Sequence, residues 1–191
     1  MAAPDAWTET GYVAICKKGG SDMEFRTITE TVDIDIGDKD FDVIPTLAGG
    51  RLVKFTPQEP TTITLEAYPV EAGTDSGDTG KGFFDLMNTA DSSQPLSISV
   101  DRNRDQYRIV CLWTDDTTIT SATSAVGPNQ TGLRIIAKNG YITSVKPSFT
   151  DGILKFTVTF KCPPFDKDGN ANVTMESTDG TATLDAVSSY T

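Results

Sequence analysis

The sequence predicts a mainly β domain, an antiparallel β-sandwich or barrel with one flanking helix and extended termini and loops. Short segments with strand patterns recur, and turn signals that contain Gly separate them. Thr, Ser, Gly and Asp are abundant, whereas long helical runs of Ala, Leu, Glu and Lys are missing. The 191 residues suffice for a core, and no repeat or linker divides them. We therefore expect a single domain over 1–191.

The strand patterns alternate with turn dipeptides along most of the chain. We expect strands at 11–16, 23–36, 51–55, 61–70, 95–101, 106–113, 132–138, 141–149 and 153–162. Asn139-Gly140 and Asp151-Gly152 tolerate left-handed backbone, so they predict hairpins between the last three strands. Segment 153–162 alternates, which predicts one face in the core and one in water. Segment 106–113 is apolar on both faces, which predicts a central strand covered on both sides.

One segment, 81–90, has a helical pattern. Phe83, Leu86, Met87 and Ala90 follow one another at i, i+3, i+4 and i+7, which makes an apolar stripe. We expect this helix to pack over the sheet.

Three segments carry no core pattern. Residues 1–10 form an N-terminal arm, and 115–131 form a Ser/Thr-rich loop of a length that is typical of functional or disordered loops. The C-terminal extension, 166–191, is acidic but carries the spaced apolar residues Val187 and Tyr190. A tail of this kind often docks on another surface.

Composition excludes several functions. The net charge of −11 argues against binding nucleic acid through its phosphates, which requires clustered Lys and Arg. The chain has no histidine, so it lacks the commonest general base and every Ser/His or Cys/His pair. We therefore expect no enzyme. The N-terminus resembles no signal peptide, and no segment is long and apolar enough to span a membrane.

The cysteines and one acidic loop are the candidate metal ligands of the sequence. Cys16, Cys111 and Cys162 are scattered without a CxxC pair, so we expect buried free thiols. A candidate calcium loop begins at three alternating oxygen-bearing residues, Asp166, Asp168 and Asn170. Its glycine stands in the fourth place instead of the sixth, which favours a plain Asp-Gly turn. We expect no metal and no cofactor.

Charged residues gather in two further places. In the segment 31–43, Asp33 and Asp35 share one face of a strand while apolar residues take the other. Like charges so placed repel, which calls for an explanation. The arginines of the second cluster are Arg102, Arg104 and Arg108. They form either a subunit-interface patch that meets an Asp-rich surface of another copy or a turn with local ion pairs.

The segment GGRLVKFTPQEPTTITLEAYPVEAG (49–73) resembles a known protein family. Further matching segments are GFFDLMNT (82–89), DRNRDQYRIVCLWTDD (101–116) and YITSVKPSFTDGILKFTVTFKCPPFDKDGNAN (141–172). In these segments the chain resembles the major tail tube proteins of long-tailed, siphovirus-like viruses of bacteria and archaea. The likeness runs from about 49 to 176, roughly two thirds of the chain.

The resemblance implies a structural virion protein of the tail, assembled in the host cytoplasm. In that family, subunits with a β-sandwich or barrel and one helix form rings, commonly hexameric, that stack into a hollow tube. Inner sheets of adjacent subunits join edge to edge and line a channel for the genome. The implied partners are further copies of the chain, the tape measure, the tail terminator and the tail tip, with no membrane. The long loop and both terminal segments then make contacts between subunits or rings.

The resemblance also gives the acidic strand a role. DNA must slide through the channel without binding, and carboxylates repel phosphates over a Debye length of about 8 Å. We expect Asp33 and Asp35 to line the lumen, with Glu30 and Asp38 beside them. The alternative is an ordinary solvated outer face. Two other functions stay open: the inner tube protein of a contractile injection system, and a calcium-binding acidic β-sandwich surface protein.

Overall fold

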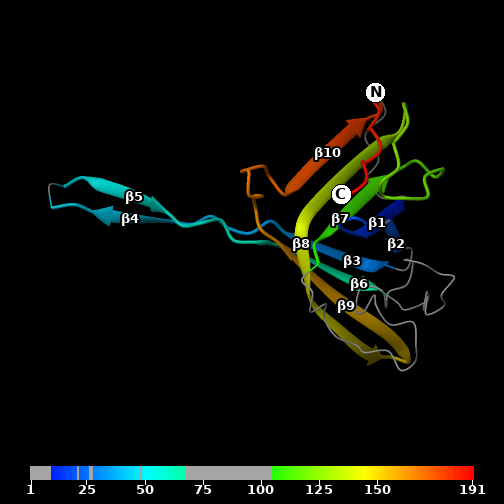
Figure 1. Ribbon diagram of the computed structural model, residues 1–191, viewed down its shortest axis with the longest axis horizontal. Helices are drawn as coiled ribbons and strands as arrows, with labels where there is room; N and C mark the ends of the chain where they lie inside the picture. The colour runs from blue at the N-terminus through cyan, green and yellow to red at the C-terminus, as the bar shows by residue number, and fades with distance from the viewer. Residues whose placement is uncertain (1–9, 21, 26–27, 48, 68–104) are drawn as a thin grey trace.

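The computed structural model describes residues 10–20, 22–25, 28–47, 49–67 and 105–191, and it is mainly β (Figure 1). Its strands are β1 Thr10–Lys17, β2 Asp22–Phe25, β3 Ile28–Asp35, β4 Phe41–Pro45, β5 Arg51–Phe55, β6 Thr61–Ala67, β7 Tyr107–Thr114, β8 Thr131–Thr150, β9 Ile153–Cys162 and β10 Val173–Asp179. The expected helix at 81–90 and the expected strand at 95–101 lie outside the described residues. Within the described ranges, no helix is long and apolar enough to cross a membrane.

A strand of 20 residues, β8, joins two antiparallel layers. The strand order is β2-β1-β7-β8-β9-β6-β3, and β10 also pairs with β8. The first half of β8 pairs with β7 and β10, whereas its second half pairs with β9. We name β2, β1, β7, β8 and β10 the first layer. We name β3, β6, β9 and the second half of β8 the second layer.

The predicted hairpin at Asn139-Gly140 is wrong, because β8 runs through both residues. Asn139 does take the left-handed conformation, with φ 58°. It bends the strand without reversing it, and a side chain at Gly140 would collide with the Phe160 ring. The second hairpin prediction is confirmed: Asp151 and Gly152, both at positive φ, connect β8 to β9.

The main core lies between the two layers. Its buried side chains come from β1, β6, β7, β8 and β9, and include Ile15, Ile63, Ile109, Val158 and Phe160. The alternation predicted for segment 153–162 is confirmed, because Phe156, Val158 and Phe160 are buried while the residues between them are partly or fully exposed.

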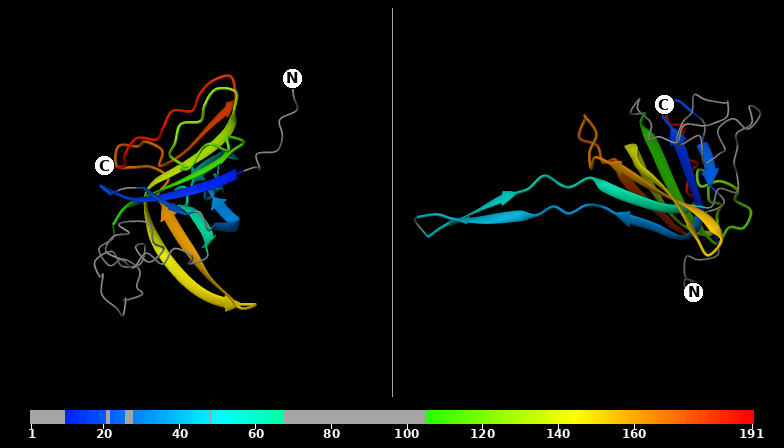
Figure 2. Two further views of the ribbon diagram at one scale, coloured as in Figure 1. Left: turned by 90° about the vertical axis from the view of Figure 1, so that its right-hand side faces the viewer. Right: turned by 90° about the horizontal axis from the view of Figure 1, so that it is seen from below.

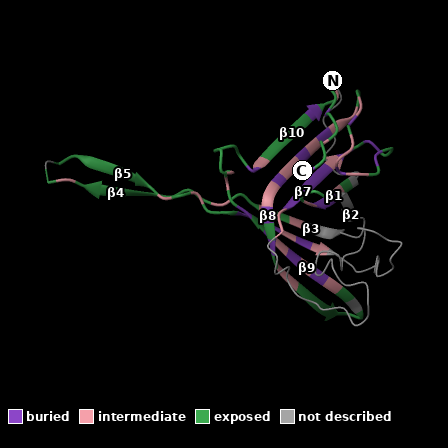
Figure 3. Cartoon of the chain, viewed as in Figure 1, coloured by how far each residue is buried: buried purple, intermediate pink, exposed green. Residues whose placement is uncertain are grey.

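A second apolar cluster covers the outer face of the first layer. Its members are Ala14, Val110, Leu112, Ile119, Ala122, Val126 and Leu184. Ile119, Ala122 and Val126 belong to the 115–131 loop, which is therefore packed against the sheet. Strand β7 has core on both sides and is buried almost throughout, as its sequence predicts (Figure 3).

The last residues, 184–191, cross the same outer face, and we call them the strap. Val126 and Leu184 exchange backbone hydrogen bonds, and the Val187 N–H donates to the Thr123 carbonyl over 2.9 Å. The Tyr190 hydroxyl donates to Asn139 Oδ1 over 2.9 Å. The C-terminal residues thus dock on their own chain.

Arg134, on β8, ties the strap to the 115–131 loop. Its guanidinium is fully buried and donates to the Asp185 carbonyl over 2.6 Å and to the Ser124 carbonyl. Glu176 Oε2 lies 3.4 Å from Arg134 Nη1. Burial lowers the pKa of the guanidinium, and the charge of Glu176 opposes that shift. The charge is thus retained because backbone carbonyls and one carboxylate surround it.

We expect Arg134→Met to lower the free energy of unfolding by about 2–4 kcal/mol, because it removes the buried guanidinium that donates to the Asp185 and Ser124 carbonyls. Urea denaturation followed by tryptophan fluorescence measures this. Lys167→Met is the matched control, since its ion pair with Asp168 is exposed and worth less than about 1 kcal/mol. Equal stabilities of the two variants would contradict the role of Arg134.

Candidate self-assembly surfaces

The second layer has one face in the core and one in water. Val32 and Ile34 pack against the core, whereas Asp33 and Asp35 between them are exposed, so the predicted alternation in this strand is confirmed. Residues directly opposite one another on neighbouring strands share a face. The wet side, which we call the polar face, therefore contains the rows Asp35–Thr62–Lys161–Tyr141, Asp33–Thr64–Thr159–Ser144 and Glu66–Thr157–Lys146.

The charges on the polar face are segregated. Its described carboxylates, those of Asp33, Asp35 and Glu66, lie on β3 and β6. Its lysines, Lys146, Lys155 and Lys161, lie on β8 and β9. Threonine hydroxyls occupy the strip between them. Among its described side chains, the polar face thus balances three negative charges with three positive ones, in a chain whose net charge is −11.

The other two predicted lumen residues differ in what the structure describes. Glu30 belongs to β3, but its side chain lies outside the described part. Asp38 is exposed beyond the end of β3, where its carbonyl accepts a hydrogen bond from the Glu59 N–H over 2.9 Å. Of the four predicted carboxylates, the described side chains of Asp33 and Asp35 thus share the polar face.

Both outer edges of the second layer are open in the described residues. There, β3 pairs only with β6, and the second half of β8 pairs only with β9. Open strand edges present unpaired N–H and C=O groups that can pair with another chain.

Strands β4 and β5 form a hairpin that extends far from both layers, and we call residues 36–60 the arm (Figures 1 and 2). Every residue of the two strands is exposed (Figure 3). Its exposed large apolar residues are Ile36, Phe41, Val43, Ile44, Leu47, Leu52, Val53 and Phe55. An isolated two-stranded hairpin is marginally stable in water, so this surface requires a cover.

The register of the arm places apolar pairs on both faces. Phe41 lies opposite Phe55, with ring centroids 6.2 Å apart, and Val43 lies opposite Val53 on the same face. Ile44 and Leu52 form a pair on the reverse face. The strand at 51–55 is predicted from the sequence but its hairpin with 41–45 is not, although apolar residues on either side of Gly49-Gly50 are its signal.

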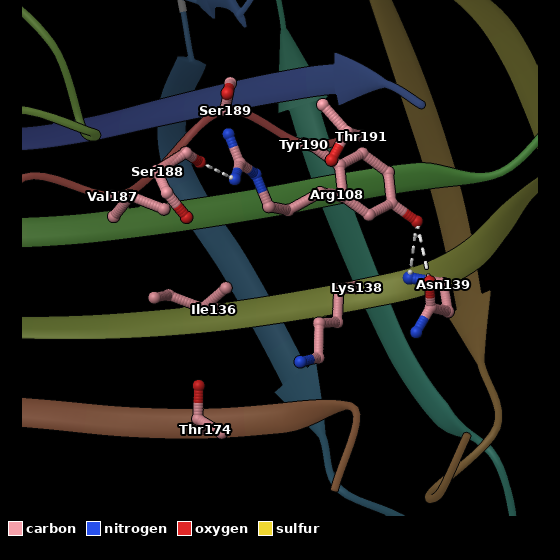
Figure 4. Close-up of a pocket in the computed structure, with 10 residues that line it drawn as sticks. All are labelled: Arg108, Ile136, Lys138, Asn139, Thr174, Val187, Ser188, Ser189, Tyr190 and Thr191. Carbon is pink, nitrogen blue, oxygen red and sulfur yellow. Dashed lines mark hydrogen bonds between the residues drawn. The ribbon is translucent and has the colours of Figure 1, made fainter. Parts of the chain in front are cut away.

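Arg108, predicted to be part of an interface, is buried beneath the strap. Its Nη1 donates to the Ser188 carbonyl over 2.5 Å, and its Cζ lies 5.5 Å from the centroid of the Tyr190 ring (Figure 4). The predicted surface role requires an exposed guanidinium, which Arg108 does not offer, because β7 is central and covered. Arg102 and Arg104 lie outside the described residues.

Neither candidate metal ligand set is arranged as a metal site. The Asp166 carboxylate accepts hydrogen bonds from the Asn170 side-chain amide and from the N–H groups of Asn170 and Asp168, and these bonds hold the pKa of Asp166 below its usual value. In the described part of the chain, no three His, Cys, Asp or Glu residues are grouped to hold a metal. The prediction of buried free thiols is confirmed, and burial raises the pKa of Cys111 to about 12 and that of Cys162 to about 11.

No family model and no curated protein matches the chain. Among solved structures it is similar to a sheath/tube terminator of an extracellular contractile injection system in its extended state. The identity is 17%, the TM-score is 0.48, and the match covers 91% of this chain and 99% of that one. It is also similar to the anti-feeding prophage tube terminating cap, with 12% identity, a TM-score of 0.47 and coverage of 93% and 95%.

A third similar structure is the Hcp1 protein of E. coli EAEC 042, with 12% identity, a TM-score of 0.36 and coverage of 87% and 97%. TM-scores below 0.5 at such identities establish no relationship of function. What this chain does must therefore be inferred from its own edges, faces and arm.

We expect Phe55→Ser, on the arm, to weaken self-association at least tenfold without changing the thermal stability of the two layers. The serine removes a large apolar contact but touches nothing in the core. Analytical ultracentrifugation measures the association. Met175→Ser is the control, because Met175 lies on β10 and is exposed to a similar extent, 69% against 62% for Phe55. If both variants associate like the parent chain, the arm is not a contact surface.

Proposed function

We propose that this chain is a structural, non-enzymatic subunit of a viral tail tube. Copies associate into rings, hexameric in the family it resembles, and the rings stack into a hollow tube that conducts viral DNA into the host cell. The observation that carries this proposal is the second layer, which in the described residues has two open edges, one apolar face and one polar face. A ring of such layers satisfies every edge, because each copy pairs with the next until the ring closes.

The arm supports stacking of the rings. It projects away from both layers and exposes apolar side chains on its two faces. A second copy of the chain, reached beyond the ring, is the cover that this surface requires. The long loop and the strap, in contrast, are occupied by contacts within the chain.

The polar face supports a channel lining. Asp33, Asp35 and, by its place on β3, Glu30 would then border the lumen on one side of each copy. The hydroxyls of Thr62, Thr64, Thr157 and Thr159 would lie in the middle. Such a wall offers a passing duplex neither an apolar surface nor a continuous row of cations, so DNA passes without specific binding. The tape measure, tail terminator and tail tip complete the proposed set of partners, in the tail of the virion.

A second candidate is the inner tube of a contractile injection system that passes protein. The charge balance of the polar face favours it, because a protein cargo requires no anionic wall. The calcium-binding alternative draws no support from Asp166, whose carboxylate already closes a turn with Asn170.

Negative-stain microscopy of the purified chain tests the proposal directly. We expect rings or tubes with a central channel, formed in increasing number as the protein concentration rises. A chain that stays monomeric over a wide range of concentration and salt would refute a tube subunit of either kind.

The DNA cargo has its own test, at a residue in the centre of the polar face. We expect Thr64→Lys tubes to assemble but to retain duplex DNA, because each copy adds a cation that binds phosphate in a salt-dependent way. Co-sedimentation of short duplexes with assembled tubes measures retention. Thr174→Lys, exposed on β10, gives the same charge outside the polar face. Equal retention by both variants would place the polar face outside the lumen.

A further inference from the structure

The two open edges of the second layer carry opposite charges on the same face. The β3 edge presents Asp33 and Asp35, and the β8 edge presents Lys146. Lys146 lies opposite Thr157 of β9, which in turn lies opposite Glu66 of β6. The polar face therefore grades from acidic at one edge to basic at the other, which is a complementary arrangement for joining identical copies head to tail.

Strand direction allows the same joining. The pairs β3–β6, β6–β9 and β9–β8 are all antiparallel, so β3 and β8, at the two ends of the four strands, run in opposite directions. When copies are related by rotation about a ring axis, the β3 strand of one copy runs antiparallel to the β8 strand of the next. Every pairing around the ring is then of the same type, and the contact is heterologous, as a closed ring requires.

The side chains behind the two edges agree with this geometry. Val32 and Ile34 of β3, and Val145 of β8, pack against the core but are only partly buried. A neighbouring strand on either edge would extend their apolar face and cover them further. Pro147 has no N–H group to donate, so we assign the edge pairing to the stretch of β8 that precedes it, Tyr141–Lys146.

The proposed ring joins the β3 edge of one copy to the β8 edge of the next, and we infer that Asp33 and Asp35 of one copy lie beside Lys146 of the other across this seam. The inference rests on the proposed tube and specifies its lateral contact. It changes the role predicted for the two aspartates. They neutralise lysines of the neighbouring copy, so that the wall of the channel is lined by hydroxyls and balanced in charge.

An alternative hypothesis, in which Lys146 prevents pairing at the β8 edge, predicts the opposite effect on assembly. Lysines on exposed edges often prevent association between sheets. Removal of the positive charge at the edge then promotes assembly, whereas the proposed seam requires that it weakens assembly. The two are therefore distinguishable by one variant.

The experiment measures the critical concentration for tube formation by sedimentation and microscopy. We expect Lys146→Glu to raise it about threefold to tenfold, since each exposed pair is weak but is repeated in every seam. Asp33→Lys is expected to act likewise, and the double variant Asp33→Lys with Lys146→Glu to restore assembly. Salt at about 0.5 M is expected to weaken the parent tubes through screening. Lys167→Glu, an equal charge change on the exposed β9–β10 loop, is expected to change nothing.

The outcomes separate the seam from the function. If the parent chain forms tubes and Lys146→Glu forms them at an unchanged or lower concentration, the seam is refuted and the tube subunit stands. If both single variants are impaired but the double variant is not restored, the pairing of these residues is refuted. If the parent chain forms no tubes, the proposed function and the seam fall together. Circular dichroism of each variant establishes that it is folded.

Discussion

The continuity of β8 is the constraint on which the rest of the structure depends. One strand of 20 residues belongs to both layers, because its first half pairs with β7 and β10 and its second half with β9. A break at Asn139-Gly140 would separate the layers, and the core between them would lose its frame. The absence of a side chain at Gly140 allows β8 to pass close to Phe160 at this bend. The open β8 edge of the second layer is a consequence, because the second half of β8 extends beyond its pairing with β7 and β10.

Two buried arginines show how an acidic chain covers its central strands. Arg108 and Arg134 come from the neighbouring strands β7 and β8, and both donate to backbone carbonyls of the strap. Carbonyl acceptors do not depend on the side chains of the strap, so the arginines fix its path while Leu184 and Tyr190 fill the apolar sites. The outer face of the first layer is thereby closed within the chain. This leaves the second layer and the arm as the surfaces offered to other copies.

Charge is distributed unevenly between these surfaces, and this affects the proposed function. The net charge of −11 does not extend to the polar face, where the described carboxylates and lysines are equal in number. The hydroxyls and locally neutralised charges of such a channel wall prevent DNA from adhering. Long-range electrostatic repulsion contributes less. Only the carboxylates on the β3 side of each copy then repel DNA, unless lysines of the neighbouring copy neutralise these carboxylates.

The sequence by itself determined several of the strands and which side of each of them is apolar. The alternation at Val32–Asp35 and at 153–162, the doubly apolar 106–113, the buried thiols and the turn at Asp151-Gly152 are all local patterns that the backbone obeys. Tertiary structure decided the rest. It kept β8 continuous through Asn139, folded the 115–131 loop onto β7, buried Arg108 and left β4 and β5 uncovered by any other described residue. These outcomes depend on partners distant in the chain, such as Asp185, 51 positions from Arg134. No local pattern of hydrophobicity or turn residues contains that information.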